Sequence, residues 1–447
     1  MNLDQAFQNL LPNAAEAQVM EVFAPPFLEA LGFGASERFS QFPIGGKPRV
    51  DYAARKNSDD NIFSQNLKHP YLYMEVKGRV RNLGDEHHNH YREAARQLKG
   101  YLLDPASESV KWGILVNSLH VQLFRKHGKV IHPETPCIPL NTDIQRVARD
   151  LKQRIESPKR ALIVTVYNNK GGVGKTTTTL NLATTLALLK KRVLIVDFEP
   201  NQSDLGDSLN LQPLQGKLLN ILKSRDPDIR EIITSHKLEH PKVQRPPSFD
   251  IILADEGMAN DLDEAKLSQQ LKLHALKRAL ESVQNDYDYI LIDAPPNWRL
   301  FAKKAIFAAD AVLIPARHDN LHSLQNAGTA ITRFIPEIQK ERQQIGESGP
   351  IALPIFMNNT FKPTGPAIQL MHQAIDKIIQ DAKANFDGFD LKPYFYPKSS
   401  QGHENRKMIS IPYMAYISRA DFMHMPAAFA FKAAREQYLN LVKEYFL

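Results

Sequence analysis

The chain is poor in cysteine and in long apolar runs. Cys137 is its single cysteine among 447 residues, which excludes a disulfide framework and any metal site built from cysteines and suits a reducing cytoplasm. No basic segment followed by an apolar stretch opens the chain, and no stretch reaches the roughly 18 apolar residues that a membrane-spanning helix needs. We therefore expect a cytoplasmic protein without a membrane segment, in which Cys137 is a half-buried apolar residue.

Chain length and net charge indicate how many domains the protein has and which partners it can bind. A chain of 447 residues is too long for one ordinary compact core, so we expect two or three domains. The hydrophobic share of 43% indicates a globular protein. The formal charge of +7 and the pI near 9.1 permit contact with a polyanion such as DNA without demonstrating it.

Residues 1–140 have the pattern of a small mixed domain. A helical opening over residues 14–33 is followed by short apolar strands, and a helix with apolar residues at helical spacing separates the second strand from the third. The strands are expected at residues 49–54, 71–78, 111–117 and 120–126, and the helix at 90–103. Residues 141–160 are rich in charge, and we expect them to form a helical linker that ends at Pro158.

Residues 161–447 have a different pattern, in which continuous apolar strands alternate with helices. Runs without polar alternation are typical of parallel strands that are covered on both faces. This half therefore predicts a doubly wound α/β domain with a mostly parallel sheet. The strands are expected at residues 161–168, 192–199, 249–255, 287–296, 311–316 and 351–359.

A glycine-rich loop, KGGVGKTTT, lies between the first of these strands and a helix. The sequence matches the general phosphate-binding pattern G-x-x-x-x-G-K-[ST], except that Asn169 replaces the first glycine. The loop's backbone amides and the following helix N-terminus would surround phosphates, Lys175 would reach the β- and γ-phosphates, and Thr176 would offer its hydroxyl to Mg²⁺. A second lysine, Lys170, is more than such a loop needs to bind a nucleotide.

These motifs resemble those of the deviant Walker A ATPases, the ParA/MinD family, and most closely its Soj-like ParA branch. The resemblance spans about residues 160–440 and implies a P-loop ATPase domain that binds ATP and Mg²⁺. Lys170 matches the signature lysine, which in that family reaches the ATP of a second subunit, so the resemblance implies a homodimer formed across ATP. The ATP-binding residues that it implies are Lys170, Gly171, Gly172, Val173, Gly174, Lys175, Thr176, Thr177, Asn358 and Pro412.

Three acidic positions also match that family. Asp197 corresponds to the first aspartate of the motif D-x-D-P-Q-x-N and is expected near Mg²⁺ or the P-loop. Glu199 replaces the aspartate that orients the attacking water, and its extra methylene alters the geometry of hydrolysis. Asp293 ends an apolar strand before Pro-Pro, like a Walker B acid, and is expected to support Mg²⁺ through water.

Two later positions match segments of the family that approach the base. Asn358 corresponds to a residue that often approaches the adenine, and Pro412 lies in the C-terminal segment of the family and is expected to pack beside the base.

The first domain contains the pattern D…E-x-K on two consecutive strands. Alternate residues of a strand share a face, so Asp51, Glu75 and Lys77 are expected on one edge of the sheet. Two carboxylates can hold Mg²⁺, and the lysine can orient or activate water for attack on a phosphodiester. The pattern alone has low specificity, and a domain that only binds DNA or a partner, with Lys77 solvated, explains it as well.

The residues around this pattern resemble the N-terminal nuclease domain of the R subunits of type I restriction enzymes. That domain has a restriction-endonuclease-like PD-(D/E)XK fold. Asp51, Glu75 and Lys77 match its core motif, although Val50 replaces the proline. The resemblance further implies a supporting pair, Gln97 and Tyr101, and an acid from the first helix, Glu16.

Two surface features have alternative interpretations. Clustered histidines in a polar loop are more often solvated than bound to metal; they are His87, His88 and His90. Four basic residues are equally compatible with phosphate contacts and with a solvated face; they are Lys303, Lys304, Arg406 and Lys407.

The sequence therefore favours a ParA-type, ATP-dependent dimerising switch fused to a Mg²⁺-dependent, nuclease-like domain that acts on DNA, in a setting such as defence against foreign DNA. The alternative is a partition or positioning ATPase that binds DNA nonspecifically, with a cleavage-inactive first domain that recognises DNA or a ParB-like partner. In a third interpretation, the ATPase half is a regulator or adaptor, and its slow turnover of ATP times an interaction. No membrane partner is expected.

Overall fold

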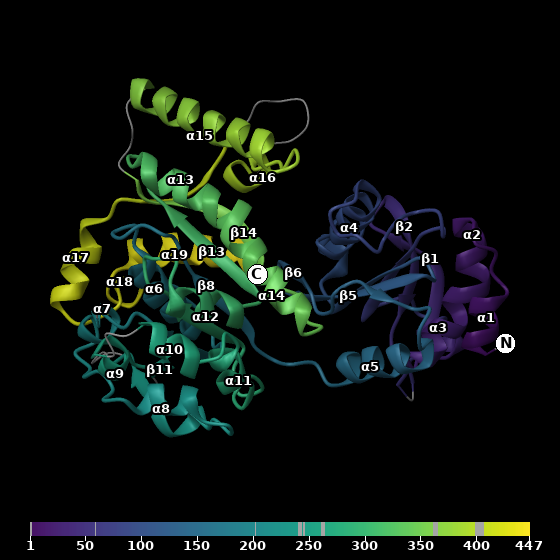
Figure 1. Ribbon diagram of the computed structural model, residues 1–447, viewed down its shortest axis with the longest axis horizontal. Coiled ribbons are helices and arrows are strands. Elements are labelled where there is room, and N and C mark those ends of the chain that lie inside the picture. Colours follow the sequence, from purple (N-terminus) through teal and green to yellow (C-terminus); the bar gives the residue numbers. More distant parts are fainter. Residues whose placement is uncertain are drawn as a thin grey trace. The chain divides into compact units, whose positions relative to one another are not determined.

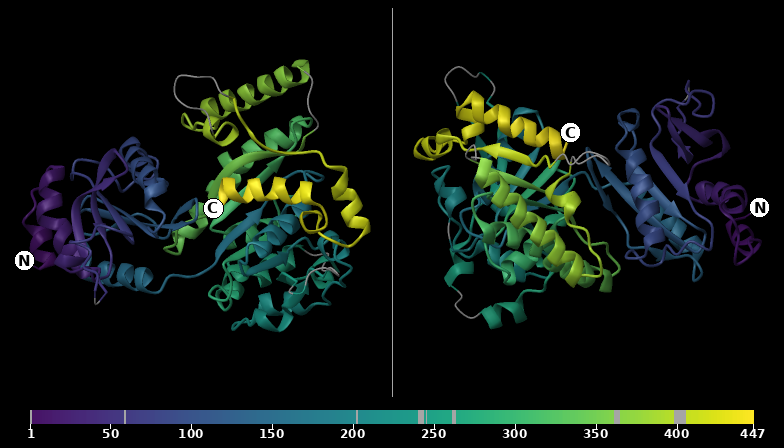
Figure 2. Two further views of the ribbon diagram at one scale, coloured as in Figure 1. Left: turned by 180° about the vertical axis from the view of Figure 1, so that it is seen from behind. Right: turned by 90° about the horizontal axis from the view of Figure 1, so that it is seen from above.

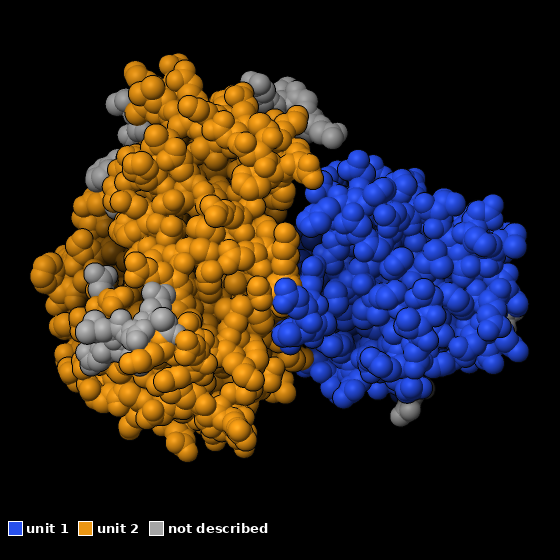
Figure 3. Space-filling model, viewed as in Figure 1, with its two compact units in different colours: residues 1–158, 343–348, 446 blue, residues 159–342, 349–445, 447 orange. Residues whose placement is uncertain are grey.

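The computed structural model describes residues 2–58, 60–201, 203–239, 244, 246–260, 264–360, 365–397 and 406–447 (Figure 1). The chain divides into two compact units, coloured separately in Figure 3. Unit 1 comprises residues 1–158, 343–348 and 446, and unit 2 comprises residues 159–342, 349–445 and 447. Among the described residues, every helix is too short or too polar to cross a bilayer.

Unit 1 is a mixed α/β structure with helices on both sides of a sheet. Its helices are α1 (Leu3–Gln8), α2 (Glu16–Gln18), the π-helical turn η1 (Val19–Phe23), α3 (Ala24–Ala30), η2 (Ala35–Glu37), α4 (Asn89–Leu102), η3 (Pro105–Ser107) and α5 (Ile144–Glu156). Its strands are β1 (Arg38–Ile44), β2 (Lys47–Ala54), β3 (Leu72–Val76), β4 (Trp112–Val116), β5 (His120–His127), β6 (Val130–Pro133) and β7 (Ile138–Pro139).

The unit 1 sheet runs in the order β1-β2-β3-β4-β5-β6, with β7 paired to β5. The first three strands form an antiparallel meander, and α4 then crosses over so that β4 lies parallel to β3. Because successive residues of β3 point to opposite faces, Met74 packs in the core beneath α1, α3 and α5, whereas Tyr73 packs in the core beneath α4. The middle of β2 and the carboxyl end of β3, which lie side by side, are thereby held between two apolar layers.

Helix α5 is part of the unit 1 core and is not a free connector. It spans most of the segment expected to be a charged linker, but one stripe of apolar residues at helical spacing is buried in the core with α3. These residues are Ile144, Val147, Ala148, Leu151 and Ile155. The charged residues that suggested a linker form the opposite, solvated face of the helix.

Unit 2 is an α/β domain. Its strands are β8 (Leu162–Val166), β9 (Val193–Asp197), β10 (Thr234–Lys237), β11 (Ser248–Ile252), β12 (Tyr289–Asp293), β13 (Ala311–Ala316), β14 (Ile351–Thr360) and β15 (Ile409–Pro412). Its helices are α6 (Lys175–Leu188), α7 (Asp204–Asp207), α8 (Lys217–Lys223), η4 (Ile229–Ile232), α9 (Glu256–Asn260), α10 (Glu264–Gln270), α11 (Ala275–Glu281), α12 (Leu300–Ala308), α13 (Leu321–Thr329), the π-helical turn η5 (Ala330–Phe334), α14 (Ile335–Gln344), α15 (Gly365–Asn385), α16 (Lys392–Phe395), α17 (Ala415–Phe422), α18 (Ala427–Ala430) and α19 (Lys432–Tyr445).

The unit 2 sheet has the order β10-β11-β9-β12-β8-β13-β14-β15, and only β10 pairs antiparallel. Helix α6 lies against strands β8, β9, β11 and β12 and also packs on α18 and α19. Viewed from behind in Figure 2, α19 lies in front of the sheet, while α8, α11, α12 and α13 pack in the core on the other face. The doubly wound, mostly parallel sheet predicted from the apolar strands is confirmed.

All ten strands predicted from the sequence are present, at nearly the expected positions. Strands β1, β6, β7, β10 and β15 were not predicted. They lie at or near the sheet edges, and in β15 the exposed Ser410 and Pro412 interrupt the apolar pattern. Edge strands carry weaker sequence patterns because only part of their surface is buried.

Shortening Leu151 to alanine should destabilise unit 1 by about 2–5 kcal/mol, because this fully buried leucine of α5 would leave a cavity in the core. Urea unfolding of unit 1 can be followed through Trp112 fluorescence in a Trp298→Phe background. The exposed Lys152→Ala on the same helix is the control and should change little. An unchanged midpoint in Leu151→Ala would restore the linker interpretation.

Candidate functional site

The glycine-rich loop of unit 2 joins the end of β8 to the start of α6, the central strand–loop–helix of the sheet. Gly172 and Gly174 have φ angles of 72° and 82°, a left-handed conformation that glycine adopts without steric cost. A Cβ on Gly174 would also collide with the side chain of Asn358. The glycines thus let the backbone turn tightly and leave the first amides of α6 available to phosphate.

Asparagine side chains from neighbouring elements hold the loop in place. The Asn358 amide donates to the carbonyl of Val173 at 2.9 Å, and the Asn326 amide donates to that of Asn169, also at 2.9 Å. The buried Asn168 donates to the carbonyls of Pro315 and Ser323 in β13 and α13. Sequence reasoning missed Asn168 and Asn326, because their role depends on carbonyls that are distant in the chain.

The two lysines of the loop differ in their surroundings. Lys175 is 8% exposed and its Nζ lies 3.4 Å from the Lys170 carbonyl; burial lowers its pKa, while Asp293 and Glu199 act in the opposite direction. Within the described part of the chain, the half-exposed side chain of Lys170 makes no hydrogen bond or ion pair. Lys175 therefore points into the site, and the Lys170 ammonium is free to meet another molecule.

Two aspartates are buried side by side beneath the loop. Asp197 ends β9 and Asp293 ends β12, where the two residues are register partners in neighbouring parallel strands, and each is 1% exposed. Burial raises the pKa of Asp197 well above its usual range and that of Asp293 to about 7, although the Thr176 hydroxyl, by hydrogen bonding, and Lys175 lower the latter. One oxygen of each carboxylate has no hydrogen-bond partner among the described residues, which a divalent cation or its water would supply.

Glu199 follows Asp197 and is also buried, at 8% exposure. Its carboxylate accepts hydrogen bonds from the backbone amide and the side-chain amide of Asn201, at 3.0 and 3.2 Å. Asn201 replaces the glutamine customary at that position of the motif. The Glu199 carboxylate is therefore held in place by Asn201, two residues later in the same turn.

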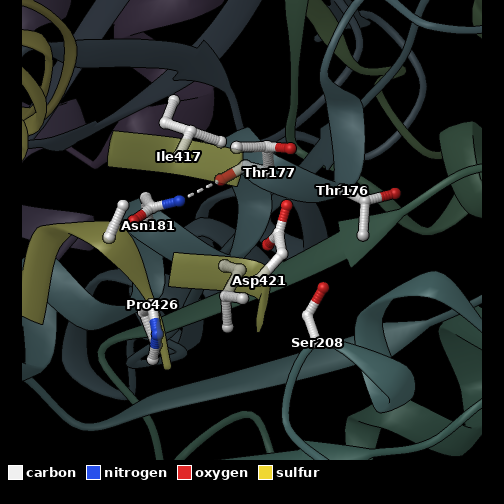
Figure 4. Close-up of a pocket in the computed structure, with 9 residues that line it drawn as sticks. Thr176, Thr177, Asn181, Ser208, Ile417, Asp421 and Pro426 are labelled. Atoms are coloured by element: carbon white, nitrogen blue, oxygen red, sulfur yellow. Dashed lines mark hydrogen bonds between the residues drawn. The ribbon is translucent and has the colours of Figure 1, made fainter. Parts of the chain in front are cut away.

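A small cavity lies at the outer side of the α6 N-terminus. Figure 4 shows Thr176, Thr177, Asn181, Ser208 and Asp421 around it, with the Asn181 amide bonded to the Thr177 carbonyl. A wider cavity of about 490 Å³ adjoins it. It has further lining side chains from α7 and from the segment around the end of α17, namely Asp204, Asp207, Phe422 and His424.

The residues expected beside the base lie on neighbouring strands β14 and β15. Asn358 is 3% exposed and its amide is committed to the loop, whereas Pro412 is exposed and pairs with Thr360. Their roles toward adenine stay predictions.

In unit 1, Asp51 and Glu75 lie on paired strands, 7% and 1% exposed. Lys77 donates to Glu75 at 2.6 Å, and Asp51 accepts from the Val76 amide at 2.8 Å and from Gln41 at 3.3 Å. Burial and the charge of Asp51 raise the pKa of Glu75 to about 7 although Lys77 lowers it. The second carboxylate oxygen of Glu75 has no hydrogen-bond partner among the described residues.

Glu16 is the helical acid that approaches this group. Its carboxylate lies 3.6 Å from the Lys77 ammonium. Gly78 allows the approach, because a Cβ there would come within 3.1 Å of the Glu16 amide nitrogen. Arg79 fixes the preceding loop through its backbone bond to Ala14 and its guanidinium bonds to the carbonyls of residues 7, 10 and 11. The sequence did not predict these Arg79 bonds to the segment before α2, although Arg79 directly follows Lys77 and Gly78 in the chain.

Gln97 and Tyr101, one turn apart on α4, are hydrogen-bonded to each other at 2.9 Å. Burial is the main cause of the raised pKa of Tyr101, and the charges of Glu75 and Asp51 raise it further. Gln97 and Tyr101 therefore lie near Asp51 and Glu75. Across the described residues, no three His, Cys, Asp or Glu side chains converge in a metal-binding cluster. Glu16, Asp51 and Glu75 therefore do not form a ready-made three-carboxylate site.

Comparisons with known proteins concern mainly unit 2. Residues 161–346 match a family model described as AAA domain. The chain is 30% identical over 251 residues to an uncharacterized protein of Pseudomonas putida, which covers 54% of this chain and 90% of that protein. It is 37% identical over 158 residues to the sporulation initiation inhibitor protein Soj of Bacillus subtilis, covering 35% of this chain and 58% of Soj.

The chromosome partitioning protein ParA of Myxococcus xanthus is 36% identical over 155 residues, covering 34% of this chain and 51% of that protein. Unit 2 is thus similar to ParA/MinD-type P-loop ATPases. Among solved structures, apo McdA of Cyanothece is 20% identical with a TM-score of 0.45, covering 64% of this chain and 99% of that chain. A structure of pNOB8 ParA bound to nonspecific DNA is 20% identical with a TM-score of 0.43 and the same coverages.

Several basic surface residues need a corrected interpretation. Lys304 is 1% exposed and donates to the carbonyls of Leu271 and Lys272, so it is unavailable for phosphate contacts. Lys303 is ion-paired to Glu337. The predicted half-burial of Cys137 is confirmed.

The remaining surface candidates lie in polar settings. Arg406 pairs with Asp376. His88 caps α4, accepting from the backbone amide of His90.

The raised pKa of Glu75 predicts a pH-dependent stability of unit 1. The folded protein keeps the Glu75 proton up to about pH 7, whereas an unfolded glutamate loses it near 4.5. The folded state thus binds more protons between these values, and its free energy of unfolding falls as the pH rises, then levels off above pH 7. Glu75→Gln should remove this pH dependence, because the group that titrates is gone.

Urea unfolding at pH 5 and pH 8, followed through Trp112, measures this difference separately from unit 2. The exposed Glu21→Gln serves as the matched control and should keep the parent's pH dependence. Parallel behaviour of parent and Glu75→Gln at both pH values would contradict the prediction.

Proposed function

We propose that this chain is an ATP-dependent, dimerising ParA-type ATPase whose unit 1 is a Mg²⁺-dependent nuclease acting on DNA. The observation that carries the proposal is the group Asp51, Glu75 and Lys77 on neighbouring strands, with a buried oxygen on Glu75 that has no partner among the described residues. A buried acidic pair beside a lysine is costly to a fold unless a ligand uses it.

In unit 2 the residues fit a nucleotide with Mg²⁺. The backbone from Gly171 to Thr177 would hold the phosphates, with Lys175 between them and the buried aspartates. Thr176, Asp197 and Asp293 would hold the metal directly or through water, and two acids with unpartnered oxygens support this set. When bound, Mg²⁺ neutralises charge that develops on the phosphates.

The free Lys170 ammonium supports a second proposed step, in which it binds the nucleotide of another subunit. Such a contact would form a homodimer only while ATP is bound, and so bring two copies of unit 1 into one assembly. Glu199 would orient the attacking water, and Asn201 holds its carboxylate. Because this acid is one methylene longer than the family's aspartate, we expect slow hydrolysis with undiminished binding.

In unit 1 the pairing of β2 with β3, the bond between Lys77 and Glu75 and the approach of Glu16 to Lys77 support a common site. Asp51, Glu75 and the more exposed Glu16 would hold the cation together with a DNA phosphate, since Mg²⁺ is commonly bound by one or two carboxylates plus substrate oxygens. When bound, the cation polarises the phosphate. Lys77 would orient or activate water, and Gln97 and Tyr101 would support the acids and the DNA backbone.

A partition or positioning ATPase is the second candidate, favoured by the identity to Soj and ParA. In that case unit 1 would recognise DNA or a ParB-like protein without cutting. The bond between Lys77 and Glu75 would then be a structural ion pair.

Cleavage of supercoiled plasmid separates the two candidates. With Mg²⁺ or Mn²⁺ the intact chain should nick or linearise the plasmid, and Lys77→Ala should lose at least about 100-fold in rate, because the group that handles water is gone. Lys152→Ala, which removes an exposed lysine of unit 1, is the control and should cut normally. Intact protein that hydrolyses ATP but never cuts would leave only the partition ATPase.

The two loop lysines should separate binding from dimerisation. Lys175→Ala should abolish ATP binding in calorimetry, because it removes the buried cation that faces the phosphates. Lys170→Ala should bind ATP within about threefold of the parent but stay monomeric in sedimentation, since that side chain has no role within its own subunit. A dimeric Lys170→Ala with ATP would contradict the proposed role.

A further inference from the structure

Unit 1 has a second hollow, separate from the Asp51–Glu75 pair. It has a volume of about 640 Å³ and is formed by β1, the loop before β3, the start of β3 and the segment between α4 and β4. Its floor contains Phe42 and Tyr73, whose ring centroids are 5.9 Å apart. Exposed apolar residues form part of the rim, namely Pro43, Pro105 and Ala106.

Lysines are concentrated at the same hollow. Lys68 and Lys111 line it and are exposed, against one acid among the lining residues, Glu108. The next cation is Lys126, which donates to the carbonyl of Ser107 at 2.6 Å. Burial and the charge of Lys111 lower the pKa of Lys126 to about 8, so these two ammonium groups are close together.

The backbone presents these residues through an unusual turn. His69 has a φ of 54°, a left-handed conformation that is rare for a residue with a side chain. The turn is fixed by Pro70, whose carbonyl accepts from Ser109 at 2.8 Å, and by the Tyr73–Ser107 hydroxyl contact at 3.1 Å. The hollow is therefore a built feature held by hydrogen bonds from two loops.

Position relates the hollow to the acidic pair. Tyr73, Glu75 and Lys77 alternate along one strand and its extension, so they share a face of the sheet. Alternate residues of a strand are roughly 7 Å apart, which is close to the spacing of successive nucleotides in an extended nucleic-acid strand.

We propose that this hollow binds one nucleotide of a nucleic-acid strand, with its base against the exposed Pro43, Pro105 and Ala106 of the rim and its phosphate at Lys68 and Lys111. An apolar surface for the base beside a cationic edge for the phosphate is the combination that binds single-stranded nucleic acid. The site rests on the proposed action of unit 1 on DNA and would select the nucleotide next to the one presented to Asp51 and Glu75.

Binding of a fluorescent single-stranded DNA of about 12 nucleotides tests the site. Anisotropy is measured on full-length Lys175→Ala, without ATP and in EDTA, so that the P-loop and cleavage play no part. Adding Lys68→Gln with Lys111→Gln should weaken binding about tenfold. Ala106→Trp, which fills the hollow while keeping every charge, should do the same, and Lys152→Gln should not.

Photocrosslinking with 4-thiothymidine in the same DNA gives the location. Crosslinks are expected in residues 42–43, 67–73 or 105–111. Equal affinities for all variants, or crosslinks confined to unit 2, would overturn the proposal. Thymidine 5′-monophosphate is the competitor. If it displaces the DNA at equal nucleotide concentration, the hollow binds a free nucleotide, and the proposal that it binds a nucleotide within a strand is overturned.

The outcomes also separate this site from the nuclease proposal. DNA binding in EDTA that depends on the hollow, by a protein that never cuts plasmid, would retain the hollow and overturn the nuclease. If the protein cuts plasmid, but the double lysine variant and Ala106→Trp bind DNA like the parent, the nuclease proposal is retained and the nucleotide site in the hollow is overturned.

Discussion

Burial of a carboxylate pair beside a single lysine, on two neighbouring strands, is the constraint on which both units depend. In unit 2 the pair is Asp197 and Asp293, with Lys175 above it, and in unit 1 it is Asp51 and Glu75, with Lys77. One lysine cannot neutralise two buried acids, so each site keeps a raised carboxylate pKa and unpartnered oxygens. Each unit thus keeps a buried carboxylate oxygen unpartnered among the described residues, and we propose that a cation and a phosphate complete each site.

The two sites reach this arrangement through different scaffolds. Unit 2 uses parallel strands, whose carboxyl ends meet at one edge, and asparagine amides that hold the phosphate loop in its open turn. Unit 1 uses an antiparallel meander, and the K-G-R segment brings the helical acid Glu16 to Lys77. Two unrelated sheets therefore present the same chemical group, a buried pair of carboxylates beside one lysine.

Much of the fold could be predicted, because strong apolar periodicity and the glycine-rich loop are local signals. The ten predicted strands, the doubly wound sheet and the ParA/MinD-type ATPase were obtained in this way. Long-range contacts were not accessible. The burial of α5 in unit 1, the fate of Lys304 as a buried donor and the loop contacts of Asn168 and Asn326 each depend on partners far away in sequence.

Manganese binding to the intact chain, counted by electron paramagnetic resonance, tests the central claim most directly. The account predicts one bound ion without nucleotide, lost in Glu75→Gln, and a second that appears with ATP and is lost in Asp293→Asn. No bound ion without nucleotide, or one that survives in Glu75→Gln, would contradict the claim that unit 1 has its own cation site.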